Sequence, residues 1–501
     1  MQLSLFPTNQ LEQSHFPTLA RSAFSHGSVC RANERIALEM QYGHLLEETT
    51  KFSRKLVSYQ GNKGELVHSW LRYREGFSAD LVEILIREFG LTSASLVLDP
   101  FAGSATTLLV ARYLGINATG IEILPVCHLA WEAKSKFYDY DVDELKSIQQ
   151  RLQTTSPTKT TTSFPHVAIT QGAFSDETEN DLMFFTQWIE ALEISEQSKT
   201  LCRLLLTSIL EEISYTRKDG QYLRWDSRSA KVQNRNLIRL AQGKEATRSV
   251  DLGTLPAVSQ SLIAALDVVI RDIQKLQTLN FPTSRQQFLH GSALSILPTM
   301  PGEQFDAVIT SPPYCNRYDY TRTYALELAY LGVGDGIFAL RQEQLSCTVE
   351  NRPKLENLRA IYHALGETER FAEILSVIQS NPALNEVNAA LQVRMSRGDL
   401  NNRGVLAMVE QYFTELAFVF AEIYRTCKPG ACIAFVNDNV RYGGEVIPVD
   451  LLTTHLAEAL GFEPVKVYVL PQRKGNSSQQ MSKFGREALR KSITIWRKPG
   501  V

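Results

Sequence analysis

The stretch between residues 96 and 122 constrains the fold more than any other part of the chain. A short apolar run ends at Asp99 and a glycine-containing turn follows it, and an apolar helical stretch then begins at Thr106 and stops at Gly115. A second apolar run ends at Glu122. Strand, turn, helix and strand in this order predict a βαβ unit, because two parallel strands need a crossover connection, which is usually a helix.

The same alternation returns further along the chain. Apolar runs at 307–310 and 433–436 predict two more strands, and the segments 405–427 and 451–460 have helical spacing. Two last apolar runs near the end of the chain are joined by a basic loop and predict a closing hairpin. This alternation predicts an α/β fold with a doubly wound, mostly parallel sheet that has helices on both faces.

The spacing between these elements divides the chain of 501 residues. More than 160 residues separate Glu122 from the next expected strand, near Phe288, and about 70 separate Tyr330 from Val405. Connections in such sheets are usually far shorter, so both gaps hold extra structure, and their residue pattern indicates helices. We assign an N-terminal extension (1–59), a sheet domain in three parts (60–138, 281–332 and 404–501) and two helical insertions (139–280 and 333–403).

The turn after the first strand reads DPFAGSATT at 99–107 and opens a helix. Backbone N–H groups at a helix N-terminus attract electron-rich groups, and Gly103 lets the backbone approach such a ligand closely. Glu122 ends the second strand, 19 residues after Gly103. In nucleotide-binding sheets of this topology, an acidic side chain at this place accepts hydrogen bonds from ribose hydroxyls. These features indicate an adenosine-containing cofactor, with a purely structural turn as the alternative. Dinucleotides are disfavoured, because Ala105 stands where G-x-G-x-x-G has its second glycine.

The run FDAVITSPPY at 305–314 is the sharpest chemical signal in the chain. An amino group attached to a ring becomes reactive when its nitrogen lone pair is freed from the ring, and two hydrogen-bond acceptors aimed at the amino hydrogens promote this. Two acceptors, the Ser311 hydroxyl and the Pro312 carbonyl, suit this task, because the prolines Pro312 and Pro313 fix φ and present carbonyls rigidly. Tyr314 offers an aromatic face on which a planar ring can stack. The alternative, a plain Pro-Pro turn, does not explain the cofactor-like turn in the same sheet.

Three tyrosines follow this turn closely, and each either lines a substrate pocket beside it or packs in the core: Tyr318, Tyr320 and Tyr324.

The sequence DPFAGSATT resembles the DPFAGSGTT signature of amino-methylating DNA methyltransferases, whose cofactor is S-adenosylmethionine. The resemblance implies a seven-stranded, Rossmann-like methyltransferase sheet. Ala105 replaces the second glycine of the signature and is expected to narrow the methionine end of the pocket, and Ser292 stands where the family usually has an acidic residue. The cofactor-binding residues that the turn and the resemblance together indicate are Phe77, Ser78, Asp99, Pro100, Phe101, Ala102, Gly103, Thr106, Glu122 and Ser292. Ser78 also precedes an apolar stripe at helical spacing, so it is predicted as the N-cap of that helix.

The version Ser-Pro-Pro-Tyr at 311–314 is similar to that of N4-cytosine methyltransferases, whereas N6-adenine enzymes usually begin this turn with Asp or Asn. The resemblance therefore implies a site-specific enzyme that makes N4-methylcytosine in double-stranded DNA. In such an enzyme Ser311 and Pro312 are expected to hold the amino group during methyl transfer, and Tyr314 is expected to stack on the flipped base. Attack on a ring carbon is disfavoured because no cysteine stands in a Pro-Cys setting. The alternatives are N6-adenine methylation, methylation of an RNA base or a protein amide, and a non-catalytic DNA-binding regulator.

The net charge of −2 hides two basic stretches. Residues 217–248 hold nine Lys or Arg against three acids, and residues 466–498 hold nine against one. Such patches are typical of polyanion-binding surfaces, with solvated faces as the alternative. The candidate DNA-binding residues in these stretches are Arg217, Lys218, Arg224, Arg228, Arg473 and Lys474.

Seven cysteines with no CxxC pair suggest neither a disulfide framework nor a metal site. The chain has no signal-peptide pattern and no stretch approaching the 18 or so apolar residues of a membrane span. We therefore expect a cytoplasmic, bacterial-type enzyme that acts on DNA, in some settings beside a separate restriction endonuclease. The sequence leaves the oligomeric state and the recognised site open.

Overall fold

The computed structural model describes residues 33–219, 222–247, 253–471, 484–485 and 489–500. Within this part of the chain, eight strands form one central sheet in the order β1-β11-β12-β8-β7-β2-β3-β6. Their bounds are Leu46–Glu48 (β1), Glu463–Val469 (β11), Lys491–Arg497 (β12), Cys427–Asp438 (β8), Phe305–Thr310 (β7), Leu96–Asp99 (β2), Asn117–Glu122 (β3) and Gln286–His290 (β6).

The pairing of these strands confirms the predicted α/β fold. The five strands from β8 to β6 pair in parallel with one another, as β1 does with β11, whereas β12 runs antiparallel to both of its neighbours. The predicted closing hairpin is therefore present as β11 and β12. The expected count of seven strands is wrong, because β1 from the N-terminal extension pairs along β11, with Leu46 opposite Val467.

Alternate side chains of each central strand point to opposite faces of the sheet. In β8, Ile433 and Phe435 belong to one apolar cluster, and Ala434 and Val436 belong to the other. The first face is covered by α10 (Ala293–Ile296), α17 (Gly404–Thr426) and α18 (Val449–Ala459). The second is covered by α2 (Ala79–Glu88) and α3 (Thr106–Tyr113). Both faces are thus buried, as a doubly wound sheet requires.

Helix α17 corrects one expectation from the sequence. By length and composition it is long and apolar enough to cross a membrane, although no such stretch was expected. Of its most apolar 18-residue window, however, 61% is buried inside the protein. Its Phe413, Leu416 and Phe420 belong to the apolar cluster of the first face, so α17 is a core helix of this fold.

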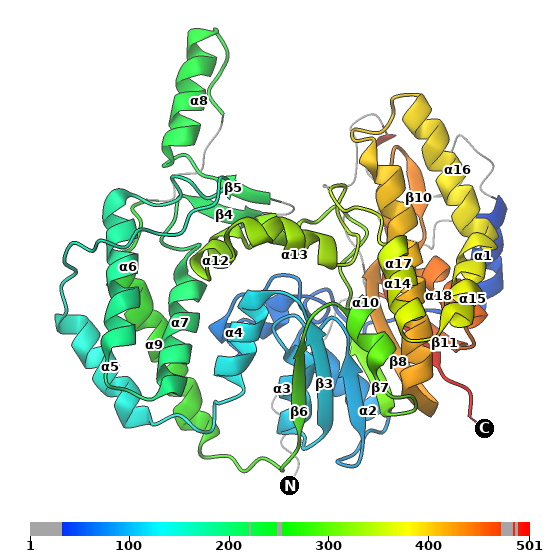
Figure 1. Ribbon diagram of the computed structural model, residues 1–501, viewed down its shortest axis with the longest axis horizontal. Helices are drawn as coiled ribbons and strands as arrows, with labels where there is room; N and C mark the ends of the chain where they lie inside the picture. The colour runs from blue at the N-terminus through cyan, green and yellow to red at the C-terminus, as the bar shows by residue number, and fades with distance from the viewer. Residues whose placement is uncertain (1–32, 220–221, 248–252, 472–483, 486–488, 501) are drawn as a thin grey trace.

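The first insertion is mainly helical, as its pattern predicts. Helices α5 (Val142–Thr154), α6 (Asp176–Ala191), α7 (Glu196–Ile209) and α9 (Val258–Leu276) share an apolar core with α4 (Pro125–Lys134) and α12 (Ala325–Tyr330). Figure 1 shows this bundle at one side of the sheet, with α8 (Ala230–Ala241) projecting from it. A two-stranded hairpin, β4 (Thr216–Asp219) and β5 (Tyr222–Trp225), was not foreseen.

The second insertion and the N-terminal extension pack together. Helices α13 (Ile337–Glu343), α14 (Leu355–Ala364), α15 (Thr368–Gln379) and α16 (Pro382–Ser396) fill the insertion, and α1 (Asn33–Tyr42) lies beside α16 (Figure 1). A further hairpin, β9 (Val440–Tyr442) and β10 (Glu445–Ile447), joins them through buried ion pairs. Arg35 on α1 pairs with Glu386 on α16 at 2.7 Å and with Glu445 on β10 at 3.3 Å.

The remaining short elements are α11 (Tyr320–Thr323) and 3₁₀ turns at Gly43–Leu45, Tyr59–Asn62, His68–Trp70, Leu297–Thr299 and Gly334–Gly336. No observation tests the domain boundaries assigned from the sequence, which stay predictions.

Candidate functional site

The two turns singled out in the sequence follow neighbouring strands. Strands β2 and β7 pair in parallel, with Leu98 opposite Val308, so the cofactor turn (residues 99–107) and the SPPY turn (residues 311–314) leave the same edge of the sheet. Ligands bind at this edge in open α/β sheets. The hydroxyl of Thr310, the last residue of β7, connects that strand to the cofactor turn by donating to the Asp99 carboxylate at 2.7 Å.

Asp99 holds the cofactor turn together from inside. Its carboxylate accepts the hydroxyl of Thr107 at 2.7 Å and the N–H of Phe101 at 3.2 Å, besides the Thr310 hydroxyl. Burial raises the pKa of Asp99 to about 6, against the opposing effect of these hydrogen bonds. Asp99 is 1% exposed and does not line the neighbouring pocket. The expectation that Asp99 contacts the cofactor is therefore wrong for this structure, because all its contacts are internal.

Ser78 is a second correction of this kind. It is fully buried, and its hydroxyl caps helix α2 by accepting the N–H of Leu81 at 3.3 Å. The N-cap role that the sequence predicts is confirmed, but the side chain does not line the pocket.

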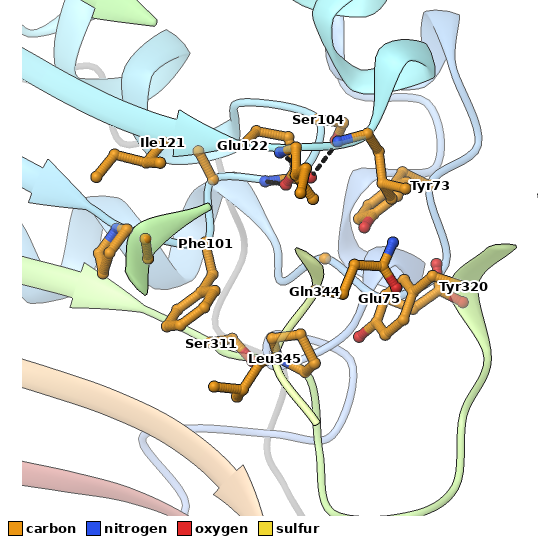
Figure 2. Close-up of a pocket in the computed structure, with 18 of the residues that line it drawn as sticks. Tyr73, Glu75, Phe101, Ser104, Ile121, Glu122, Ser311, Tyr320, Gln344 and Leu345 are labelled. Atoms are coloured by element: carbon orange, nitrogen blue, oxygen red, sulfur yellow. Dashed lines mark hydrogen bonds between the residues drawn. The ribbon is translucent and has the colours of Figure 1, made fainter. Parts of the chain in front are cut away.

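The other predicted cofactor residues come together around one pocket, which we call the cofactor pocket. It encloses about 710 Å³ of empty space, including the part open to solvent. Figure 2 shows Phe101, Glu122 and Ser311 among the side chains around it. Of the residues predicted from the sequence, it is lined by Phe77, Pro100, Phe101, Ala102, Gly103, Thr106, Glu122, Ser292, Ser311 and Pro313.

Glu122 braces the cofactor turn with both oxygens of its carboxylate. One oxygen accepts the N–H of Gly103 at 2.8 Å, and the other accepts those of Ile123 and Leu124, each at 2.8 Å. Burial raises the pKa of Glu122, and the three backbone donors oppose that shift. A carboxylate has about four acceptor positions, so about one is left on the oxygen that meets Gly103. That remaining position fits a ribose hydroxyl.

Glycine is the only residue type that fits position 103 in the cofactor turn, whereas Ala105, which stands where the family signature has a second glycine, packs in the core. Gly103 has φ +51°, and a Cβ there would lie 2.8 Å from the Tyr73 ring. Ala105 also has a positive φ of 66° and is fully buried, and it packs among the apolar side chains on the α2–α3 face of the sheet. Ala105 does not line the cofactor pocket, so the expectation that it narrows the methionine end is wrong.

The SPPY turn forms part of a wall between two pockets. Ser311 and Pro313 line the cofactor pocket, whereas Pro312 and Tyr314 line an adjoining one, which we call the base pocket. The base pocket contains about 770 Å³ of empty space, including the part open to solvent. The two pockets share Glu75, Gly76 and Tyr320. A group bound in one pocket thus lies beside a group bound in the other, with Ser311 and Pro312 at their boundary.

The tyrosines after the SPPY turn divide between pocket and core. Tyr318 and Tyr320 meet edge to face, with ring centroids 5.0 Å apart, and both line the base pocket. Tyr324 is fully buried and stacks on Tyr73 at 5.2 Å, so it belongs to the core.

Sequence reasoning missed several residues of the site. Glu75 lines both pockets, the Tyr324 hydroxyl donates to its carboxylate, and burial raises its pKa. Asp438 and Lys491 line the base pocket. Gln344 and Leu345 of the second insertion line the cofactor pocket (Figure 2), and so does Glu343. Nothing near these residues in the sequence pointed to the site.

The candidate DNA-binding residues have different surroundings. Arg217 and Arg224 are exposed and lie directly opposite each other on the β4–β5 hairpin. Arg228 is partly exposed and pairs with Asp226 at 2.7 Å. Lys218 is only 5% exposed and forms an ion pair with the buried Glu327. The expectation that Lys218 meets a phosphate is therefore wrong for this structure, because its charge is neutralised inside the protein.

Arg473 and Lys474, the remaining candidates, lie outside the described residues. Among the residues that the structure does describe, no group of three or more His, Cys, Asp or Glu side chains could hold a metal ion.

Comparisons with known proteins agree with this geometry. Residues 47–164 match the model of a family described as DNA methylase. The chain is 56% identical over 486 residues to the type II methyltransferase M.BsoBI of Geobacillus stearothermophilus, over 96% of each chain. It is 39% identical over 472 residues to the type II methyltransferase M.AvaI of Nostoc sp. (strain PCC 7120), over 92% of this chain and 93% of that protein.

A solved structure attributed to a sarcosine dimethylglycine methyltransferase of Galdieria sulphuraria aligns over 84% of this chain and 85% of that chain, with 8% identity. Its TM-score of 0.26 is too low to add to what the sheet itself shows. The two type II relatives, in contrast, match nearly the full length of the chain, so the similarity is not confined to the cofactor turn. The chain therefore belongs to the N4/N6 family of type II DNA methyltransferases.

Proposed function

We propose that this protein transfers a methyl group from S-adenosylmethionine to the exocyclic N4 amino group of cytosine within a specific double-stranded DNA sequence. The observation that carries the proposal is the shared wall of the two pockets, where Ser311 faces the cofactor pocket and Pro312 faces the base pocket. Methyl transfer requires a donor and an acceptor in contact, and this wall is where two bound groups can meet.

The residues of the cofactor pocket fit S-adenosylmethionine. Phe101 and Ile121 offer apolar surface, and Glu122 retains an acceptor position for a ribose hydroxyl. When bound, the cofactor supplies an electrophilic methyl group. Ser292 lines the same pocket, and its hydroxyl accepts the N–H of Leu294 at 3.4 Å. Because this residue is a serine, adenine lacks at this position the acidic partner that the family usually provides.

The SPPY turn prepares the amino group for attack. The Ser311 hydroxyl and the Pro312 carbonyl accept the two amino hydrogens, which draws the nitrogen toward tetrahedral geometry and frees its lone pair. Tyr314 stacks on the flipped base. The amino nitrogen gains a bond to the methyl carbon and afterwards loses a proton to solvent, so no strong general base is required.

Cytosine is favoured over adenine by the serine at position 311, since this form of the turn resembles that of N4-cytosine enzymes. N6-adenine methylation is the second candidate, because both bases present an amino group beside a ring nitrogen that accepts hydrogen bonds. Methylation of an RNA base and a non-catalytic regulatory role are less well supported, because the chain combines an SPPY turn with a braced cofactor turn.

The exposed Arg217 and Arg224 of the β4–β5 hairpin are proposed to meet DNA phosphates, and the enzyme is proposed to act in the cytoplasm. A separate restriction endonuclease with the same recognition sequence is the proposed companion, since the relatives are named as type II methyltransferases.

The test is expression in a bacterial host that lacks DNA methylation, followed by mass spectrometry of nucleosides from its DNA. N4-methylcytosine is expected, at one sequence context in the methylome. N6-methyladenine alone would overturn the choice of base. Absence of both, with DNA binding retained, would favour the regulator.

A further inference from the structure

A buried lysine lies beside the SPPY turn, and the proposed reaction gives it no role. Lys491, the first residue of β12, is 9% exposed and lines the base pocket. Its ammonium lies 3.3 Å from the Asp438 carboxylate and 5.1 Å from the centroid of the Tyr314 ring. Lys491 therefore places a positive charge beside the residue that is proposed to stack on the base.

Stability of the fold does not account for this arrangement. Removing a lysine from water is costly, and a buried ion pair contributes little net stability compared with apolar side chains of similar volume. Burial alone would lower the pKa of Lys491, but Asp438 and Tyr314 together raise it, so the ammonium is charged in the pocket. A charged ammonium is thus held beside Tyr314.

The effect of the Lys491 charge on Tyr314 bears on the orientation of the Ser311 hydroxyl. A serine hydroxyl has one hydrogen and two lone pairs, so it accepts an amino hydrogen only if its own hydrogen points elsewhere. Ser311 Oγ donates to Tyr314 Oη at 3.1 Å and, at a poorer distance of 3.4 Å, to the carbonyl of Val436. The Tyr314 oxygen thereby takes up the serine hydrogen and leaves the serine lone pairs for the base.

We propose that Lys491 is a positioning residue that holds Tyr314 in place through the charge of its ammonium, so that the tyrosine hydroxyl accepts from Ser311 and Ser311 accepts a hydrogen from the target amino group. An ammonium attracts the electron-rich ring and the hydroxyl oxygen of a tyrosine beside it, and this attraction keeps the oxygen within reach of Ser311. Without Lys491 the Tyr314 hydroxyl is free to leave, and the Ser311 hydrogen then points at the amino group, where two donors repel. This inference rests on the proposed function of Ser311.

The inference is tested by single-turnover methylation of an unmethylated plasmid that carries the recognition sequence found in the methylome. Lys491→Met is expected to slow the methyl-transfer step on the order of 10- to 100-fold, the cost of misplacing a reacting group. Cofactor and DNA affinities should stay unchanged, and Lys491→Arg, which keeps the charge and the donors, should retain most of the rate. The matched control is Lys498→Met. Lys498 is 8% exposed, follows the same strand and donates to the Cys427 carbonyl, away from both pockets.

A double-mutant cycle separates positioning from a merely structural role. Tyr314→Phe removes the hydroxyl through which Lys491 acts, so Lys491→Met should cost no more than about twofold in that background. Thermal melting confirms that each variant folds, and Lys491→Gln replaces Lys491→Met if the methionine variant does not.

An equal loss in both backgrounds would overturn the inference and assign Lys491 a direct contact with the base. An unchanged rate for Lys491→Met would also overturn it, while an inactive Ser311→Ala in the same assay would leave the proposed function standing. A fully active Ser311→Ala would overturn the proposed function itself.

Discussion

Replacing Asp99 by asparagine is expected to stabilise the protein at neutral pH and to leave cofactor binding unchanged. Asp99 is 1% exposed, and burial raises its pKa from 3.8 to about 6, although two threonine hydroxyls and a backbone N–H donate to it. A change of about two pKa units corresponds to about 3 kcal/mol. The folded protein disfavours the ionised carboxyl by that free energy.

The direction of the pH dependence follows from linkage. In the unfolded chain the carboxyl loses its proton near pH 3.8, and in the folded protein it does so near pH 6. Between these values the folded state holds more protons, so the free energy of unfolding falls as the pH rises, and above about pH 6 the full penalty is present. Asparagine does not titrate. The stability gained by Asp99→Asn should therefore grow by up to about 3 kcal/mol between pH 4 and pH 7.

Urea unfolding of both proteins at pH 4, 5, 6, 7 and 8, followed by tryptophan fluorescence, measures this difference. Thr310→Val provides a second perturbation, because it removes a hydrogen bond that lowers the Asp99 pKa. The pH range over which the stability difference grows should therefore extend to higher pH. A difference between wild type and Asp99→Asn that stays constant with pH would refute the reasoning. Calorimetric titration with S-adenosylmethionine should show similar affinities, and a tenfold loss would mean that Asp99 contacts the cofactor after all.

Four further outcomes are expected. Ser311→Ala should lower the single-turnover rate on the order of 10² or more with cofactor affinity kept, and an unchanged rate would contradict its role. Glu122→Gln replaces one carboxylate oxygen by an amide NH₂ group, which cannot accept from the backbone N–H groups that Glu122 holds. The cofactor turn is then less well braced, and cofactor binding should weaken by about 1–3 kcal/mol in calorimetry. Arg224→Gln should flatten the slope of log affinity against log salt by about 0.9 on cognate and non-cognate duplexes alike. Lys218→Gln should leave that slope unchanged but destabilise the fold by about 3–5 kcal/mol, because it strands the buried Glu327.

Local patterns predicted the centre of the sheet well. The unit from β2 to β3 is signalled by apolar runs that end in acidic residues and by glycines that stop or turn the chain, and these signals depend on nearest neighbours only. The same holds for the Ser78 cap, whose partner Leu81 is three residues away. Strand β1, with the sequence Leu-Glu-Glu, has no apolar pattern, and only its pairing with β11 makes it a strand.

Counting basic residues along the sequence did not predict which of them are exposed, because burial depends on the fold. Lys218 and Arg217 are neighbours in the same basic stretch, yet successive residues of a strand point to opposite sides. Arg217 is exposed, whereas Lys218 reaches inward to Glu327. The same limitation applies to Asp99, which the cofactor signature marks correctly as part of the turn but whose carboxylate faces β7 instead of the pocket.

The position of Lys491 shows how topology builds a site that no local pattern reveals. Parallel strands bring their carboxyl ends to one edge, so the cofactor turn and the SPPY turn meet there. Strand β12 runs the other way, and its first residue, Lys491, pairs with Asp438, the last residue of β8. An antiparallel strand thus delivers its beginning to the edge where its neighbours end. The sequence places Lys491 in a basic stretch expected to meet DNA, whereas the reversal of this one strand turns it into the wall of the base pocket.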